Sequence, residues 1–421
     1  MVTRSQGLAR AMLRRMGETG QPPERGALTV NAGTQDYLEL LREEYLKPIA
    51  QAHANSTFKL VQAPFGGGKT HFLHCLRETA WQEGFITSVV GLSPKSCPFD
   101  MLATIYQAVV RELEAAPTTA YAECDHGIGD VLRAELDKRV AEYGVDQVRN
   151  WLTTELSRAR IDNHSFRRAA VRFLEALLDK NGDHEWLLES YLRGETMERS
   201  ELQPFGVREM IDEKNAFSFL KSLIQLFNAM GVPGLVLMFD EIDRIMSLTM
   251  RKRRTIADNL REMIDCCGQS FLPGLVFVYA VPPEFLTNLV PEYPALEQRL
   301  RGAERFATIS PLSPLIDLDH LSLGTQDLLR EIGLKLLELH NEAYSKNLDA
   351  GIQHANIDLL AHEMAERQLE TGIRRTFVKT VIQVLWAQKK KEKTLALEDI
   401  RTLLDHQSAP PSELEDEEIF G

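Results

Sequence analysis

Residues 57–70, TFKLVQAPFGGGKT, decide the fold of this 421-residue chain. Residues 57–63 are short, partly alternating and rich in strand formers, which predicts a β-strand. GGGKT follows, and HFLHCLRETAWQEG then continues with apolar residues at helical spacing. A glycine-rich turn between a strand and a helix presents backbone N–H groups and the positive end of the helix dipole to an anion. The stretch therefore predicts a phosphate-binding loop.

The loop fits the pattern G-x-x-x-x-G-K-[ST] at its end, where Gly68, Lys69 and Thr70 match, while Ala63 stands in place of the first glycine. We expect Lys69 to reach the β- and γ-phosphates of ATP and the Thr70 hydroxyl to coordinate Mg²⁺. A chance glycine-rich turn before a cationic helix is the alternative. The predicted nucleotide-binding residues are Pro64, Phe65, Gly66, Gly67, Gly68, Lys69, Thr70 and His71.

Four further segments are predicted as strands, at residues 85–92, 235–239, 275–281 and 306–309, with helical patterns between them. Residues 235–239, LVLMF, are all apolar, as expected of a strand covered on both faces. Strands that alternate with helices predict an α/β fold with a doubly wound parallel sheet.

The gaps between these strands predict the domain organisation. Roughly 140 residues with amphipathic helical patterns separate the second strand from the third, which predicts a helical insertion at about 100–229. We expect an N-terminal extension over 1–30, a P-loop ATPase domain over 31–315 and a helical lid module over 316–404. Residues 405–421 carry six acids and no Lys or Arg, so this tail is predicted to be disordered.

A second motif closes the apolar strand at 235–239, where Asp240 and Glu241 follow directly. Parallel α/β sheets bind ligands at the carboxyl ends of their strands. We expect Asp240 to hold Mg²⁺ through water, and Glu241 to orient and deprotonate the attacking water. Two solvated acids at the start of the next helix are the alternative.

Several arginines are candidates for stabilising the charge that develops during phosphoryl transfer. Arg299 and Arg301 precede the last predicted strand and are candidate finger residues for a neighbouring subunit; they could equally be surface arginines. In TGIRRTF, Arg375 is the preferred residue to point over the nucleotide and Arg374 the second choice, with a solvated first-turn cation as the alternative. The strand at 275–281 ends without Asn, Ser or Thr, so a polar sensor there is altered or missing.

Composition narrows the setting of these motifs. A net charge of −13 disfavours nucleic-acid binding by the whole surface, although a local basic groove remains compatible with it. The basic runs 251–254 and 389–391 lack the interleaved aromatic residues of a single-strand stacking surface. Five cysteines show no metal-ligand spacing, and no apolar run approaches the roughly 18 residues of a membrane span. With no secretory signal evident, we expect a cytoplasmic protein.

GGGKTHFL, GLVLMFDEID, the EQRL segment and TGIRRTFVK together resemble the AAA+ ATPases of the initiator and clamp-loader branch. GALTVNAGTQDYLELLREEYL, YLRGE and GVPGLVLMFDE resemble more closely the ATP-binding proteins of bacterial BREX phage-defence systems, the BrxD-like group, over roughly 27–400. This resemblance implies a bacterial ATPase that forms homo-oligomers with ATP at subunit interfaces and works with protein partners of a defence system. Related initiators carry a winged-helix DNA-binding domain after the helical module. No such domain fits in the residues that follow this module here, so the resemblance does not extend to direct DNA binding, which stays open.

We therefore predict Mg-dependent ATP hydrolysis that drives a conformational or assembly change in a DNA-transacting, anti-phage defence complex. One alternative is an ATP-gated scaffold with negligible turnover. Another is an initiator- or loader-like ATPase that remodels DNA outside defence.

Overall fold

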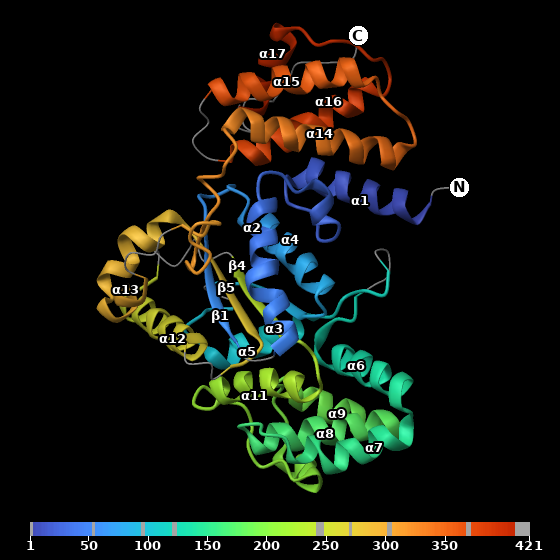
Figure 1. The fold of residues 1–421 in the computed structure, drawn as a ribbon, viewed down its shortest axis with the longest axis vertical. Helices are drawn as coiled ribbons and strands as arrows, with labels where there is room; N and C mark the ends of the chain where they lie inside the picture. Colours follow the sequence, from blue (N-terminus) through green and yellow to red (C-terminus); the bar gives the residue numbers. More distant parts are fainter. Residues whose placement is uncertain are drawn as a thin grey trace. The chain divides into compact units, whose positions relative to one another are not determined.

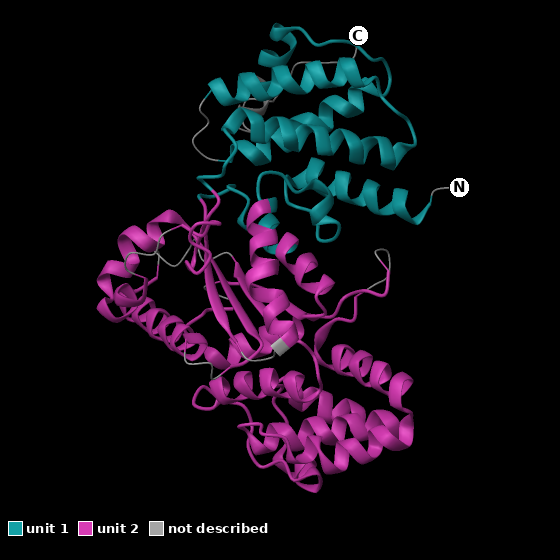
Figure 2. Ribbon diagram, in the orientation of Figure 1, with its two compact units in different colours: residues 1–35, 64–74, 319–421 teal, residues 36–63, 75–318 magenta. Residues whose placement is uncertain are grey.

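The computed structural model describes residues 3–52, 55–93, 97–119, 124–240, 248–268, 272–300, 305–367 and 372–408. These residues form two compact units, coloured separately in Figure 2. The sheet unit comprises residues 36–63 and 75–318, and the helical unit comprises residues 1–35, 64–74 and 319–421. No helix among the described residues combines the length and apolar character needed to cross a membrane.

A six-stranded sheet forms the centre of the sheet unit, with the strand order β3-β2-β4-β5-β1-β6. All neighbouring strands are parallel except β3, which pairs antiparallel with β2 at one edge. β4 and β5 are buried at every position, as expected from the apolar runs 235–239 and 275–281 that form them. The strands are β1 (Thr57–Gln62), β2 (Ile86–Gly91), β3 (Leu113–Glu114), β4 (Leu235–Asp240), β5 (Leu275–Val281) and β6 (Leu315–Asp317).

Helices lie on both sides of this sheet. In Figure 1, α2 and α4 lie on one side of β1, β4 and β5, and α12 and α13 on the other. The doubly wound α/β fold expected from the sequence is therefore confirmed. The helices outside the insertion are α2 (Gln35–Leu41), the π-helix η2 (Arg42–Leu46), α3 (Lys47–Ala52), α4 (Lys69–Gln82), α12 (Met250–Gly268), the π-helix η6 (Phe285–Leu289), η7 (Val290–Glu292) and α13 (Pro294–Leu300).

Four of the five predicted strands are confirmed, and the fifth is displaced. Residues 306–309 are not a strand: Ala307 and Ser310 form an isolated bridge with each other, and Ile309 is almost fully exposed. The last strand is instead β6, which pairs with β1 after Pro314. Both segments are short and apolar, so only the pairing with β1 distinguishes them.

Most of the described residues between β2 and β4 are helical, while the limits of the insertion at about 100–229 stay a prediction. The aromatic side chains of these helices form one core with the sheet, where the Phe219 ring lies 5.7 Å from Tyr106, 5.9 Å from Phe166 and 6.1 Å from Tyr191. The elements are α5 (Leu102–Arg111), α6 (Gly127–Tyr143), α7 (Val145–Thr154), η3 (Leu156–Arg158), α8 (His164–Asp179), α9 (Gly182–Leu192), α10 (Arg199–Leu202), η4 (Gln203–Phe205) and α11 (Ala216–Ala229).

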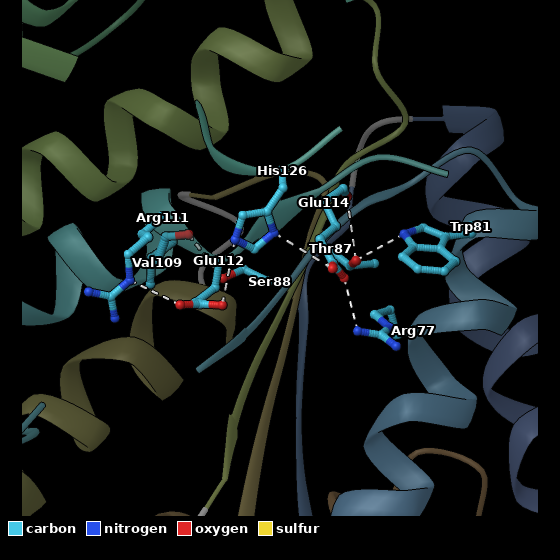
Figure 3. A network of polar contacts seen from close by, with 9 residues as sticks. All are labelled: Arg77, Trp81, Thr87, Ser88, Val109, Arg111, Glu112, Glu114 and His126. Atoms are coloured by element: carbon cyan, nitrogen blue, oxygen red, sulfur yellow. Dashed lines mark hydrogen bonds and ion pairs between the residues drawn. The ribbon is translucent and has the colours of Figure 1, made fainter. Parts of the chain in front are cut away.

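A polar network ties the start of this region to the sheet edge (Figure 3). Glu114 of β3 accepts a hydrogen bond from Nη1 of Arg77 on α4 at 2.9 Å and lies 3.7 Å from His126. Beside it, Nε1 of Trp81 donates to the Thr87 hydroxyl at 3.0 Å. The sequence does not predict β3, because a strand of two residues shows no periodicity. β3 is recognised only from its antiparallel pairing with β2 and from the buried ion pair between Arg77 and Glu114.

The helical unit joins both ends of the chain. α1 (Arg4–Thr19) begins at a capping box between Thr3 and Gln6 and packs its buried side chains, including Met12, Leu13 and Met16, against α14 and α16. The remaining elements of the unit are η1 (Ala27–Val30), α14 (Thr325–Tyr344), α15 (Ala350–Glu366), α16 (Ile373–Gln388) and α17 (Leu397–Ser408). The N-terminal helix is thus part of the core of the C-terminal helices.

Candidate nucleotide-binding site

The glycine-rich loop lies between the end of β1 and the start of α4, as the sequence predicts. Gly66 and Gly68 have φ values of +75° and +94°, which only glycine adopts without strain. α4 begins at Lys69, so the first N–H groups of a 14-residue helix follow the glycines directly. This arrangement suits the binding of phosphate groups.

Ala63 fills the place of the pattern's first glycine without distorting the loop. Its side chain is fully buried and its N–H donates to the Val281 carbonyl oxygen at 3.3 Å, so it continues the sheet. It is not among the residues with positive φ. A Cβ is therefore compatible with this position.

Lys69 and Thr70 occupy the first turn of α4. Lys69 is buried, and its Nζ donates to the Pro64 carbonyl oxygen at 3.3 Å, so the ammonium group lies across the loop. Thr70 is partly exposed. Lys69 and Thr70 are therefore the first two helical residues after the glycines of the loop.

Two histidines follow on the same helix. Burial lowers the pKa of His71 to about 4, with further lowering by His74 and Arg374. His74 donates from Nδ1 to the Pro23 carbonyl oxygen at 2.9 Å. His71 is thus neutral at physiological pH, and the positive charge beside the loop comes from Lys69, Arg374 and Arg375.

The start of α16 lies against the loop within the helical unit. Nη1 of Arg374 donates a hydrogen bond to the Gly67 carbonyl oxygen, while the Arg375 guanidinium lies 5.2 Å from the Phe65 ring centroid. Burial lowers the pKa of Arg374, and the charge of Asp319 partly offsets it. Arg374, the sequence's second choice, therefore contacts the loop backbone, whereas Arg375 contacts an exposed ring.

Asp240 closes β4 at the carboxyl edge of the sheet. Phe239 pairs with Tyr279 of β5, and Tyr279 pairs with Leu60 of β1, so the ends of these three strands lie level. Since β5 separates β4 from β1, Asp240 is two strand spacings, about 10 Å, from the strand that leads into the loop. Asp240 is buried, and Glu241 lies outside the described residues.

The end of β5 offers no polar sensing residue. The strand's polar side chain is Tyr279, which is fully buried among aromatic rings. Its hydroxyl has no hydrogen-bond partner within the described part of the chain, and burial raises its pKa well above the usual value. An altered or missing sensor at this strand end stays a prediction.

Arg299 of α13 is held by its own chain. Its guanidinium forms a bidentate ion pair with Asp265 of α12, with Nη2 at 2.7 Å from Oδ2, and Nη1 donates to the Ala295 carbonyl oxygen at 2.6 Å. The hydrogen bond to Asp265 raises the pKa of Arg299. Arg301 lies outside the described residues.

The basic run 251–254 forms ion pairs with nearby acidic residues. In the run 251–254, Lys252 lies 3.6 Å from Asp100 and Arg253 lies 3.5 Å from Glu292. Within the described ranges, no three His, Cys, Asp or Glu side chains gather as metal ligands, and the five cysteines form no disulfide. Thr70 belongs to the helical unit and Asp240 to the sheet unit, so their joint role as Mg²⁺ ligands stays a prediction.

Comparison with known proteins gives a family and a structural likeness. The profile of the family described as BREX system ATP-binding protein BrxC/D matches residues 9–402. No curated protein matches. The structure of the ORC2 protein of Aeropyrum pernix, solved in complexes with ADPNP and ADP, is 13% identical in sequence with a TM-score of 0.45, covering 94% of this chain and 72% of that one.

Proposed function

Because the chain belongs to the family of BREX system ATP-binding proteins BrxC/D, we propose that it binds Mg·ATP at residues 64–71 and hydrolyses it with Glu241. The observation that carries this proposal is the loop itself: two positive-φ glycines run into the N-terminus of α4, which bears Lys69 and Thr70. ATP is the substrate whose triphosphate such a loop binds.

Each side chain has a role in this scheme. Lys69 would neutralise the β- and γ-phosphates, and Arg374 would add positive charge on the side of α16. Thr70 and Asp240 would hold Mg²⁺, which when bound draws charge from the phosphate oxygens. Glu241 would accept a proton from the water that attacks the γ-phosphorus.

Turnover of this kind would drive a conformational or assembly change in a defence complex, with homo-oligomers that share ATP sites between subunits. The family description supports the setting. The helical unit supports the coupling, since the same unit contains loop residues 64–74 and α16. A movement of the loop would thereby be transmitted to the C-terminal helices.

The test is a comparison of wild type, Lys69→Ala and Glu241→Gln in two assays: binding of a fluorescent ATP analogue and release of phosphate. We expect Lys69→Ala to lose ATP binding while staying folded. Glu241→Gln should keep binding and lose at least about 10²-fold in turnover. Lys47→Ala, at a partly exposed lysine paired with Glu43, serves as the matched control. Normal turnover in Lys69→Ala would refute the proposal.

A second candidate is an ATP-gated scaffold that binds ATP, assembles and turns it over negligibly. The end of β5, which lacks a polar sensing side chain, favours it. In that case wild type and Glu241→Gln would show the same slow phosphate release, and ATP would still change the oligomeric state.

A further inference from the structure

A groove runs between α1 and α16 in the helical unit. Its volume is about 960 Å³, within the range of ligand sites in proteins. Gly7 and Ala11 line the groove on the side of α1 with little or no side chain. The apolar residues Leu13 and Ile382 also line the groove. α1, α14 and α16 lie together in Figure 1. A glycine at position 7 destabilises the helix by about 1 kcal/mol relative to alanine. A Cβ at Gly7 would meet no atom within 4 Å, so the missing side chain leaves open space in the groove.

The two helices that form the groove are basic in an acidic protein. The chain has a net charge of −13, yet the sequence of α16 contains three cations and no acid, and that of α1 contains four arginines against Glu18. Arg10, Arg14 and Lys379 line the groove together with one acid, Glu18, which lies 3.6 Å from the well-exposed Arg14, so the three cations exceed the acids by two. Such a local reversal of charge attracts a polyanion and not a neutral ligand.

Aromatic rings lie among these cations. Trp386 lines the groove with half of its surface exposed, and its ring lies 5.4 Å from that of Tyr344. Arg10 lies 5.1 Å from the Tyr344 ring centroid, and Lys389 lies 3.7 Å from the same centroid. The cations thus hold the aromatic pair in position while Trp386 keeps a free surface.

We propose that this α1–α16 groove binds a single strand of DNA. Cations in a groove with an exposed aromatic ring match the two needs of an unpaired strand, phosphate neutralisation and base stacking. A duplex hides its bases from Trp386, and the carboxylates of an acidic peptide would pair with the cations without using the exposed Trp386 ring. Polar lining residues such as Gln383 can hydrogen-bond a ribose 2′-hydroxyl as well, so the choice of DNA over RNA rests on the proposed function in a DNA-transacting complex.

The test measures fluorescence anisotropy of a labelled 20-nucleotide oligo-dT with the full chain. We expect wild type to bind with a log–log salt slope of about −2, since three cations contact phosphates. Trp386→Ala should weaken binding roughly tenfold or more through lost stacking. Arg14→Ala and Lys379→Ala should each weaken it and make the salt slope shallower.

The chain supplies matched controls. Trp186 is also exposed but lies beside Asp183 and Glu201, so Trp186→Ala should leave oligo-dT binding unchanged. Arg172 pairs with Glu175 on its own helix as Arg14 pairs with Glu18, so Arg172→Ala tests the loss of an exposed arginine elsewhere. Unchanged ATP-analogue binding in Trp386→Ala, with an unchanged thermal midpoint, would show that this groove acts apart from the nucleotide loop.

Four outcomes would overturn the proposal. They are no binding of oligo-dT at low salt, equal binding of a duplex of the same length, equal binding of oligo-U, and wild-type affinity in Trp386→Ala. Competition by poly-glutamate in wild type, combined with no effect of Trp386→Ala, would assign the groove to an acidic protein segment instead.

Discussion

Gly66 of the phosphate loop and Gly372 at the start of α16 touch through their backbones: a Cβ on Gly66 would lie 2.7 Å from the Cα of Gly372. We therefore predict that Gly66→Ala lowers stability by about 2 kcal/mol and prevents ATP binding, since φ of +75° and the contact both exclude a side chain. Gly231, with φ of +82° and open space where a Cβ would lie, separates the two effects. Gly231→Ala should cost only the backbone strain, measured by urea unfolding, and leave ATP binding intact.

Arg374 and Arg375 should differ in their effect on turnover. Because Arg374 reaches the loop backbone and Arg375 lies beside Phe65, we expect Arg374→Ala to reduce kcat about 10²-fold. Arg375→Ala should reduce it less than tenfold, as measured by phosphate release at saturating ATP. Arg374→Lys should restore little, because an ammonium lacks the planar fork of guanidinium. A larger loss in Arg375→Ala would reverse the assignment.

The bidentate pair between Arg299 and Asp265 predicts that Arg299 stabilises its own chain. We expect Arg299→Ala and Asp265→Ala to lower stability by similar amounts, of order 1 kcal/mol, and to change turnover less than threefold. Arg301→Ala should instead reduce turnover at least about 10³-fold if it supplies a finger to the neighbouring subunit. Steady-state ATPase rates of the assembled protein decide between them, and a collapse of turnover in Arg299→Ala alone would identify that residue as the finger.

Lys59 of β1 should make stability depend on pH. Its ammonium is buried, donates to the Tyr45 hydroxyl and the Ser313 carbonyl oxygen at 2.8 Å each, and burial lowers its pKa to about 7. Between about pH 7 and 10.5 the unfolded lysine holds a proton that the folded one has lost, so stability rises with pH, by at most about 1.4 kcal/mol per unit. Urea unfolding at pH 7, 8 and 9 measures this slope.

Lys59→Met should flatten that slope and raise stability at pH 7, because a buried methionine needs no proton removed and no charge desolvated. Lys47→Met, at a partly exposed lysine, should keep the slope of the wild type. A slope that persists in Lys59→Met would assign the pH dependence to another group.

The features that local sequence specifies were predicted well. The loop, the apolar strands β4 and β5 and the doubly wound fold follow from glycines and unbroken apolar runs that act within a few residues. The limits of the predicted domains and the roles of the site residues stay predictions.

Features set by distant pairing were not visible in the sequence. β6 was misplaced because two short apolar segments compete and only contact with β1 selects one. Arg374 and Arg375 are neighbours in sequence but lie about 100° apart around a helix. The rotation of α16 about its axis, which its tertiary packing sets, therefore decides which of the two reaches the loop. The sequence runs 251–254 and 389–391 showed no aromatic residues between cations, whereas folding brings Arg10 to Tyr344 across more than 300 positions.

The packing of α1 on α14 and α16 has a consequence for synthesis. α1 leaves the ribosome ~300 residues before its partners do, a delay on the order of tens of seconds at usual translation rates. During that time Met12, Leu13 and Met16 have no native cover. The nascent chain therefore carries an amphipathic helix with an uncovered apolar face until α14 and α16 emerge, and a chaperone that shields this face should raise the yield of folded protein.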